Sequence, residues 1–189
     1  MQGGLHFHPD NKNLVYPLGS TLIIRNMLDP NQTHFLRGHN GPITCVAVSK
    51  TGRYIATGQS THMGFKADII VWDYAKKRLM HRFTLHKVRV MCLNFSSDET
   101  YLASVGGQDD NNITIWEVES GKAIAGNSCT NLGHCCAFYN NDNTKLIVGG
   151  KYLLRVWEID YNLRKLHAVD CALGQVKRVT TCLMVDEND

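Results

Sequence analysis

Two sets of side chains in this sequence combine a histidine, a hydroxyl and an aspartate, the residue types of a nucleophilic triad. They are His39, Thr57 and Asp68, and His86, Ser104 and Asp110. In a triad the histidine takes the hydroxyl proton while the carboxylate orients the imidazole. Neither hydroxyl lies in a Gly-x-Ser-x-Gly turn that would expose it as a nucleophile. These residue types therefore permit nucleophilic catalysis, but the sequence around the two hydroxyls does not favour it.

The spacing of both sets favours a structural role. Residues 38–73 open with Gly-His and close with Trp-Asp around three β-rich runs, and His39 precedes Trp72 by 33 residues. This order resembles one WD repeat, the unit of a β-propeller blade. The resemblance implies that the histidine, hydroxyl, aspartate and tryptophan of each repeat share buried hydrogen bonds.

The resemblance transfers a polar tetrad only where the residues match. The third repeat carries all four members, and the second carries three. They are His86, Ser104, Asp110 and Trp116, and His39, Thr57 and Trp72. Asp68 lies two positions too late to complete the second set, so we expect that tetrad to be irregular.

The tryptophans set the period of the elements that position these residues. Trp116 follows Trp72 by 44 residues and Trp157 follows Trp116 by 41, within the roughly 40–45 residues of a WD repeat. The sequence therefore predicts an all-β, incomplete WD-repeat propeller. We number its blades one (1–37), two (38–85), three (86–127) and four (128–173), with the start of blade five at 174–189. We expect a fragment or shortened form, open at both ends, that either self-associates through those ends or is stabilised by a partner that covers them. A closed four-bladed ring is the competing possibility.

Runs of β-branched and apolar residues predict the strands. In blade two they are 43–48, 54–58, 68–74 and 79–85, and in blade three 90–95, 101–105 and 112–118. In blade four they are 133–139, 145–149 and 153–159, with an outer strand within 164–172. A first strand of blade five is predicted at 176–185.

Composition limits the function classes. The chain has 189 residues, 43% hydrophobic and 20% charged, as soluble globular proteins do. Its apolar runs are too short to span a membrane, and a net charge of +3 does not indicate nucleic acid. Seven cysteines without C-x-x-C spacing predict reduced thiols in the cytoplasm. We expect no cofactor, no metal, no nucleic-acid partner and no membrane partner.

Two histidine-containing segments suggest other chemistry. Residues 133–136 read Gly-His-Cys-Cys, like a repeat opening or a reactive thiol pair, but counting back from Phe138 places them inside a strand. Core packing is the favoured interpretation, with a thiol or metal role as the alternative. His6 and His8 would share one side of a strand, but no third metal ligand accompanies them.

A long loop at 59–66 and two basic groups are candidate partner-binding features. The loop carries His62, Met63, Phe65 and Lys66, and the basic residues are Lys76, Lys77 and Arg78, and Lys87 and Arg89. An apolar pair on a rim indicates either a protein-binding patch or a loop that folds back to cover the end of its blade, and the sequence does not distinguish the two. The basic groups would face an acidic partner or lie solvated at strand turns.

Several segments together resemble a family of ciliary WD-repeat proteins. They are 61–74 (THMGFKADIIVWDY), 16–19 (YPLG), 35–39 (FLRGH), 106–110 (GGQDD) and 155–160 (RVWEID). The resemblance implies a non-enzymatic scaffold of the axonemal cytoskeleton, at the inner junction of doublet microtubules. Its implied partners are tubulin and neighbouring inner-junction proteins. The alternative is a generic WD-repeat adaptor in a cytosolic complex.

Overall fold

The structure, a computed structural model, describes residues 4–186. These residues form sixteen strands in four antiparallel sheets and contain no helix that could cross a membrane. Blade one comprises β1 (His6–Phe7), β2 (Asn13–Leu18), β3 (Thr21–Asn26) and β4 (Thr33–Arg37). Blade two comprises β5 (Ile43–Val48), β6 (Tyr54–Gln59), β7 (Lys66–Asp73) and β8 (Arg78–Lys87).

The other two sheets have the same plan. Blade three comprises β9 (Val90–Phe95), β10 (Tyr101–Gly106), β11 (Asn112–Glu117) and β12 (Ala123–Ser128). Blade four comprises β13 (Gly133–Phe138), β14 (Lys145–Gly150), β15 (Leu153–Asp160) and β16 (Lys165–Asp170). Within each blade consecutive strands are hydrogen-bonded neighbours. The all-β prediction is confirmed, and the strands predicted in blades two to four all occur, with ends moved by one or two residues.

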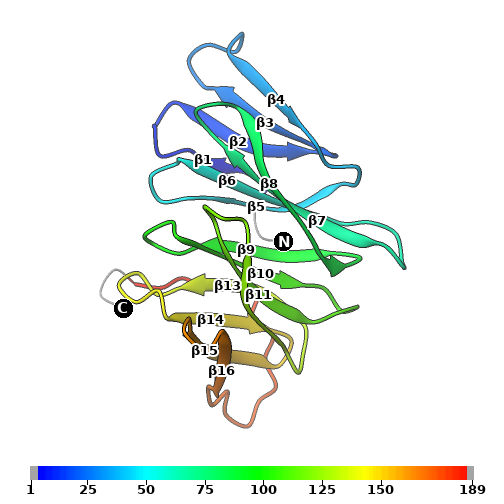
Figure 1. The fold of residues 1–189 in the computed structure, drawn as a ribbon, viewed down its shortest axis with the longest axis vertical. Coiled ribbons are helices and arrows are strands. Elements are labelled where there is room, and N and C mark those ends of the chain that lie inside the picture. The colour runs from blue at the N-terminus through cyan, green and yellow to red at the C-terminus, as the bar shows by residue number, and fades with distance from the viewer. Residues whose placement is uncertain (1–3, 187–189) are drawn as a thin grey trace.

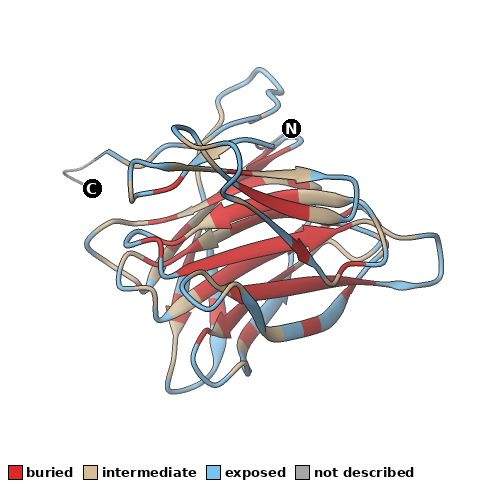
Figure 2. Cartoon of the chain, turned by 90° about the horizontal axis from the view of Figure 1, so that it is seen from above, coloured by how far each residue is buried: buried red, intermediate tan, exposed pale blue. Residues whose placement is uncertain are grey.

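The sheets follow one another in chain order along the long axis and pack face to face (Figure 1). Three apolar clusters fill the spaces between successive blades. Viewed from above, the buried residues concentrate on the strands and the exposed residues on the loops (Figure 2). Strands such as β6 are buried at every residue, because both faces of the sheet are covered. This explains why the apolar runs of the sequence are nearly continuous instead of alternating.

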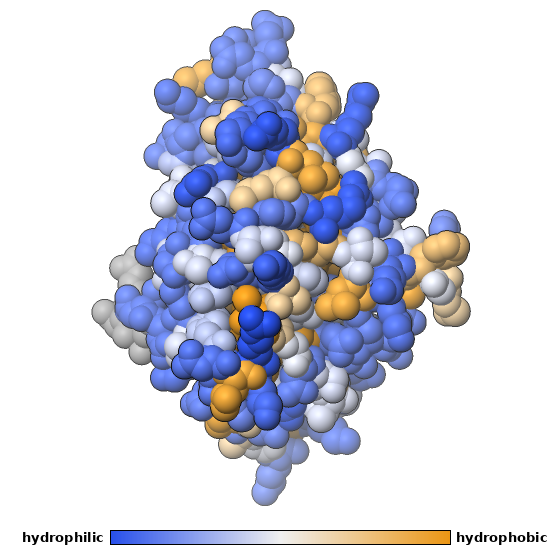
Figure 3. Space-filling view, viewed as in Figure 1, coloured by the Kyte–Doolittle hydropathy of each residue, from blue (hydrophilic) through white to orange (hydrophobic). Residues whose placement is uncertain are grey.

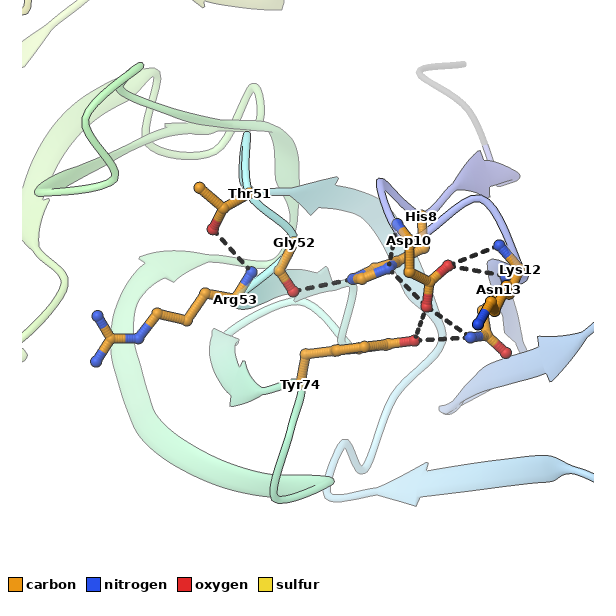
Figure 4. A network of polar contacts seen from close by, with 8 residues as sticks. All are labelled: His8, Asp10, Lys12, Asn13, Thr51, Gly52, Arg53 and Tyr74. Carbon is orange, nitrogen blue, oxygen red and sulfur yellow. Dashed lines mark hydrogen bonds and ion pairs between the residues drawn. The ribbon is translucent and has the colours of Figure 1, made fainter.

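A polar clamp joins blade one to blade two (Figure 4). His8 Nε2 lies 2.9 Å from the carbonyl oxygen of Gly52, and the His8 ring stacks on Tyr74 with centroids 3.7 Å apart. The Tyr74 hydroxyl donates to Asp10 at 2.5 Å and accepts from Asn13 Nδ2 at 2.9 Å. Burial acts to raise the pKa of Asp10, but the hydrogen bonds from Tyr74 and Asn13 outweigh it and hold that pKa below its usual value.

Equivalent turns join the later blades on the same rim. Thr51 donates from its backbone N–H to Glu99 Oε1 at 2.6 Å, which links blades two and three. Ser97 Oγ donates to the carbonyl oxygen of Asn140 at 2.5 Å, which links blades three and four. Each inner turn is therefore hydrogen-bonded to the next one along the chain.

The terminal segment corrects one strand prediction. Residues 176–185 form no regular strand and have a single bridge, between Val179 and Lys151. A strand requires a hydrogen-bonded neighbour along its length. The backbone bonds from Tyr152 N–H to Arg178 and from Thr180 N–H to Gly150 join this segment to the region of the β14–β15 turn, not to a full strand. The contacts nevertheless repeat those at the start of β9. Cys45 Sγ lies 3.8 Å from the carbonyl oxygen of Val90, and Cys135 Sγ lies 3.9 Å from that of Thr180. We propose that this segment begins a fifth blade.

Candidate functional site

Blade three joins its four polar side chains in one buried network. His86 Nδ1 donates to the carboxylate of Asp110 over 3.0 Å, and His86 Nε2 lies 2.8 Å from Ser104 Oγ. Trp116 Nε1 donates to the same oxygen at 2.8 Å. The backbone N–H of Lys87 also donates to Asp110, at 3.0 Å. Burial acts to raise the pKa of Asp110, but the hydrogen bond and charge of His86 outweigh it, so that pKa lies below its usual value.

Blade two builds the same network with a different fourth member. His39 Nε2 lies 2.7 Å from Thr57 Oγ1, and Trp72 Nε1 donates to that oxygen at 2.8 Å. His39 Nδ1 donates to Gln59 Oε1 at 2.8 Å, so an amide stands where blade three has a carboxylate. Burial lowers the pKa of His39 and so favours its neutral form. A neutral ring needs no carboxylate beside it, and the neutral amide of Gln59 can serve as its acceptor. The sequence interpretation missed Gln59.

Asp68 takes no part in that network. It forms an ion pair with Arg82 and accepts a hydrogen bond from Thr84 Oγ1 at 2.7 Å. Arg82 also donates to the carbonyl oxygen of Gly38 at 2.6 Å. Arg82 therefore ties the outer strand of blade two to the Gly-His loop, and Asp68 holds Arg82 in place. The triad suggested by His39, Thr57 and Asp68 does not exist.

The residue that accepts the hydrogen bond from the histidine Nδ1 occupies a different position in each of the two blades. Gln59 and Gly106 hold the same register position, at the end of the second strand of their blades. A Cβ at Gly106 would lie 1.9 Å from Asp110 Oδ1 and 2.6 Å from His86 Nδ1. In blade three the acceptor Asp110 comes from the loop after β10, and only glycine at position 106 leaves room for it. In blade two the acceptor is the side chain of Gln59 itself, at the equivalent strand position.

Blade four lacks the network. Val148 stands at the register position of Thr57 and Ser104. Cys129 precedes β13 by four residues, as the histidines of blades two and three precede β5 and β9. Trp157 Nε1 consequently has no hydrogen-bond partner among the described residues, although it is buried. A buried donor without an acceptor costs about 1–3 kcal/mol.

We expect Val148→Thr to raise the free energy of unfolding by about 1 kcal/mol. Threonine has nearly the shape of valine, and its oxygen would accept from Trp157 Nε1 as the hydroxyls of blades two and three do. Its proton would face the carbonyl of Arg155, the cross-strand neighbour of Val148. Urea denaturation of the two proteins measures the difference.

Two variants control that experiment. Val148→Ala removes volume without adding an acceptor, and it should lower stability by about 1–3 kcal/mol. In a Trp157→Phe background the donor is gone, so the benefit of Val148→Thr should disappear. A benefit that persists in that background would show that Trp157 is not the reason for it.

No triad nucleophile is accessible. His86 and Ser104 are fully buried, and Ser104 Oγ already meets His86 Nε2 and Trp116 Nε1. The thiols at residues 135 and 136 lie in β13. The sulfur of Cys136 is 3.3 Å from that of Cys92 in β9. Burial raises the pKa of Cys135 to about 11, which keeps this thiol protonated and unreactive near neutral pH. Within residues 4–186 no three His, Cys, Asp or Glu side chains form a metal-ligand group.

The loop before β7 forms an exposed rim knob, which we define as residues 62–66. Met63 is 84% exposed and Phe65 is 66% exposed, so neither folds back over the blade. The loop forms the projection at the right of Figure 1, where Figure 3 shows hydrophobic atoms standing away from the body. Three exposed cations flank these apolar side chains: Lys66, Lys87 and Arg89.

A strained residue holds the knob. Val88 has a φ of 60°, a conformation that a β-branched residue rarely adopts. Its N–H donates to the carbonyl of Phe65 at 3.0 Å, and its carbonyl accepts from the N–H of Thr61 at 2.7 Å. Both ends of the knob are thereby fastened to the entry of blade three. Such strain is more frequent at functional sites than elsewhere.

The second basic group lies at the other end of β7. Lys76 and Lys77 lie in the β7–β8 turn and Arg78 begins β8, whereas the knob precedes β7. Lys76 Nζ pairs with Asp73 at 3.2 Å, and Lys77 Nζ lies 3.1 Å from the centre of the Tyr74 ring. The structure therefore separates the sequence-predicted partner residues into two sites on opposite rims.

Comparison with known proteins places these observations in context. The model of the WD domain, G-beta repeat family matches residues 30–73 and 77–117. Cilia- and flagella-associated protein 52 of Chlamydomonas reinhardtii is 49% identical over all of this chain, which covers 31% of that protein. The Homo sapiens protein of the same name is 39% identical over 98% of the chain, which covers 30% of it. The chain thus spans about a third of the length of these curated relatives.

A solved structure supports the fold alone. A chain of the crystal structure of the Mitotic Checkpoint Complex superposes with a TM-score of 0.78 at 16% identity. The alignment covers 93% of this chain and 55% of the other.

Proposed function

This chain is a WD-repeat protein that is homologous over its whole length to cilia- and flagella-associated protein 52, and we propose that it is a non-catalytic scaffold of ciliary doublet microtubules. The cilium or flagellum is the location that the names of these relatives give. The observation that carries the proposal is that similarity, which extends from blade one through blade four. The finer assignment to the inner junction of the doublet is part of the proposal.

The polar networks support a scaffold. Every hydrogen-bonding atom of the blade-three tetrad is committed to another member or to the backbone, and the side chains are sealed inside the sheet stack. Such groups hold a blade in one conformation instead of meeting a substrate. The exposed chemistry lies in the loops, where partners would bind.

The rim knob is the proposed contact with tubulin and neighbouring axonemal proteins. Its apolar tip and surrounding cations suit an acidic surface with an apolar pocket. The two hydrogen bonds of Val88 restrain the base of this loop, which reduces the entropy lost on binding.

Detergent extraction of ciliated cells tests the location. A tagged form of the whole protein should remain with the doublets after the membrane and soluble matrix are removed. Release of the protein into the soluble fraction would refute the doublet scaffold and favour a generic adaptor of a cytosolic complex.

Reversing the charge of Lys66 in the knob and of the two flanking cations should weaken binding to doublets. The triple variant Lys66→Glu, Lys87→Glu, Arg89→Glu is expected to raise the Kd about tenfold, and added salt should weaken the unmodified protein similarly. Co-sedimentation with purified doublets at increasing salt measures both effects. Lys165→Glu on the outer strand of blade four is the control and should change little. Binding that ignores both salt and charge reversal would contradict the electrostatic contact and leave Met63 and Phe65 as the anchors.

A further inference from the structure

A groove lies between the outer strand of blade one and the β7–β8 turn of blade two. Its volume is about 570 Å³. One wall is β4 and the other is the start of β8 with the turn before it. Among its lining residues are Phe35, Arg37, Trp72, Lys77, Arg78 and Leu79. We call this the β4 groove.

The β4 wall offers backbone hydrogen bonds. Within residues 4–186, β4 is the last strand of its sheet and has β3 as its one hydrogen-bonded neighbour. Alternate N–H and C=O groups of an antiparallel edge strand point away from its one partner. An extended peptide can therefore add to such an edge as a further strand.

The side chains of the groove select for charge and for one apolar contact. No lining residue carries a carboxylate, whereas Arg37 and Arg78 are both exposed. Phe35 (57% exposed) and Arg37 share one face of β4, whereas Leu36 lies on the other face, in the apolar cluster with Trp72. Leu79, which is 38% exposed and pairs with Trp72, supplies apolar surface on that second face. Asp73, beside the turn, is already paired with Lys76.

We infer that the β4 groove binds an extended acidic peptide segment of a partner protein as a strand added to β4. Because peptide side chains alternate between the two faces of the added strand, carboxylates on one face meet Arg37 and carboxylates on the other meet Arg78, and the apolar peptide side chain packs on Leu79. The inference rests on the proposed function, because it assigns a class of partner to the scaffold. It adds a second binding site, at the opposite end of β7 from the rim knob.

The geometry favours a peptide over nucleic acid. Two exposed arginines neutralise only a few phosphates, whereas nucleic-acid affinity depends on many such contacts. The edge of β4 supplies directional backbone donors and acceptors that a peptide chain matches.

The test uses a fluorescein-labelled eight-residue peptide of alternating Glu and Asp with one central Leu. Fluorescence anisotropy with the purified whole chain measures the Kd. The double variant Arg37→Glu, Arg78→Glu should raise that Kd at least about tenfold. The matched control Lys122→Glu, Lys165→Glu reverses two exposed charges on blades three and four and should leave that Kd unchanged. Thermal melts followed by circular dichroism establish that both variants are folded.

Two further probes separate strand addition from simple attraction of charge. One peptide is N-methylated at its odd-numbered residues and a second at its even-numbered residues. One of the two should bind weakly and the other normally, because only every second N–H faces β4. A single-stranded oligonucleotide of equal charge should bind at least about tenfold more weakly than the peptide.

Three results would overturn the inference: equal weakening by both double variants, equal binding of the oligonucleotide, or no effect of N-methylation in either set. The assay contains no doublets, so its failure is distinguishable from failure of the proposed function. Loss of peptide binding with intact doublet binding would refute the groove alone.

Discussion

Replacing Asp110 with alanine is expected to lower the free energy of unfolding by about 3 kcal/mol. The Asp110 side chain is only 3% exposed, and it accepts from both His86 Nδ1 and the Lys87 N–H. Its removal leaves two buried or partly buried donors without an acceptor. The imidazole then loses the contact that orients its other nitrogen toward Ser104. Urea denaturation gives the change as a shift in midpoint.

Asp109→Ala is the matched control for that experiment. Asp109 is the preceding residue and is exposed, and its side chain takes no part in the hydrogen bonds that join the tetrad. Its substitution should change stability by no more than about 0.5 kcal/mol. Equal midpoints for the two variants would show that Asp110 is not the acceptor on which blade three depends.

Gly52→Ala should destabilise the chain by about 3 kcal/mol, through two effects that add. Gly52 has a φ of +79°, which disfavours any residue with a Cβ. An alanine Cβ would also lie 2.4 Å from His8 Nε2, so His8 would have to leave its stacked position on Tyr74. The clamp between blades one and two would open. Denaturation measures the total, and hydrogen exchange of β1 and β2 measures the local part.

Gly64→Ala separates the two effects. Gly64 has a φ of +89°, but no atom lies within 4 Å of its would-be Cβ. This variant therefore suffers only the backbone strain, expected to be about 1 kcal/mol. If both glycine variants lose the same stability, the contact with His8 contributes nothing to the joint between the blades.

The blade architecture was predictable because each signal is local. The Trp72, Trp116 and Trp157 spacing fixes the period, and the apolar runs between turn residues fix the strands. Asp110 could be assigned to His86 because it lies six residues before Trp116 in the same repeat. In each case residues close in sequence determine the outcome.

Contacts between blades were less predictable, and so were side chains that take the place of a tetrad residue. Gln59 serves His39 from the end of a strand, where a repeat pattern specifies no polar residue. The absence of glycine at that position, where blade three has Gly106, is the signal that could have revealed it. Stacking of His8 on Tyr74 joins residues that are 66 positions apart, and no local pattern reports such a contact.

The length of β7 has a consequence for how this scaffold could hold an assembly. The strand has eight residues, so the sites at its two ends are roughly 25 Å apart at about 3.3 Å per residue. No single side chain of a partner bridges that distance, but two segments of one partner can. Once the first segment is held, the second meets its site at an effective concentration set by the linker between them. Two weak contacts joined in this way give an avidity that exceeds either affinity by about 10²–10⁴.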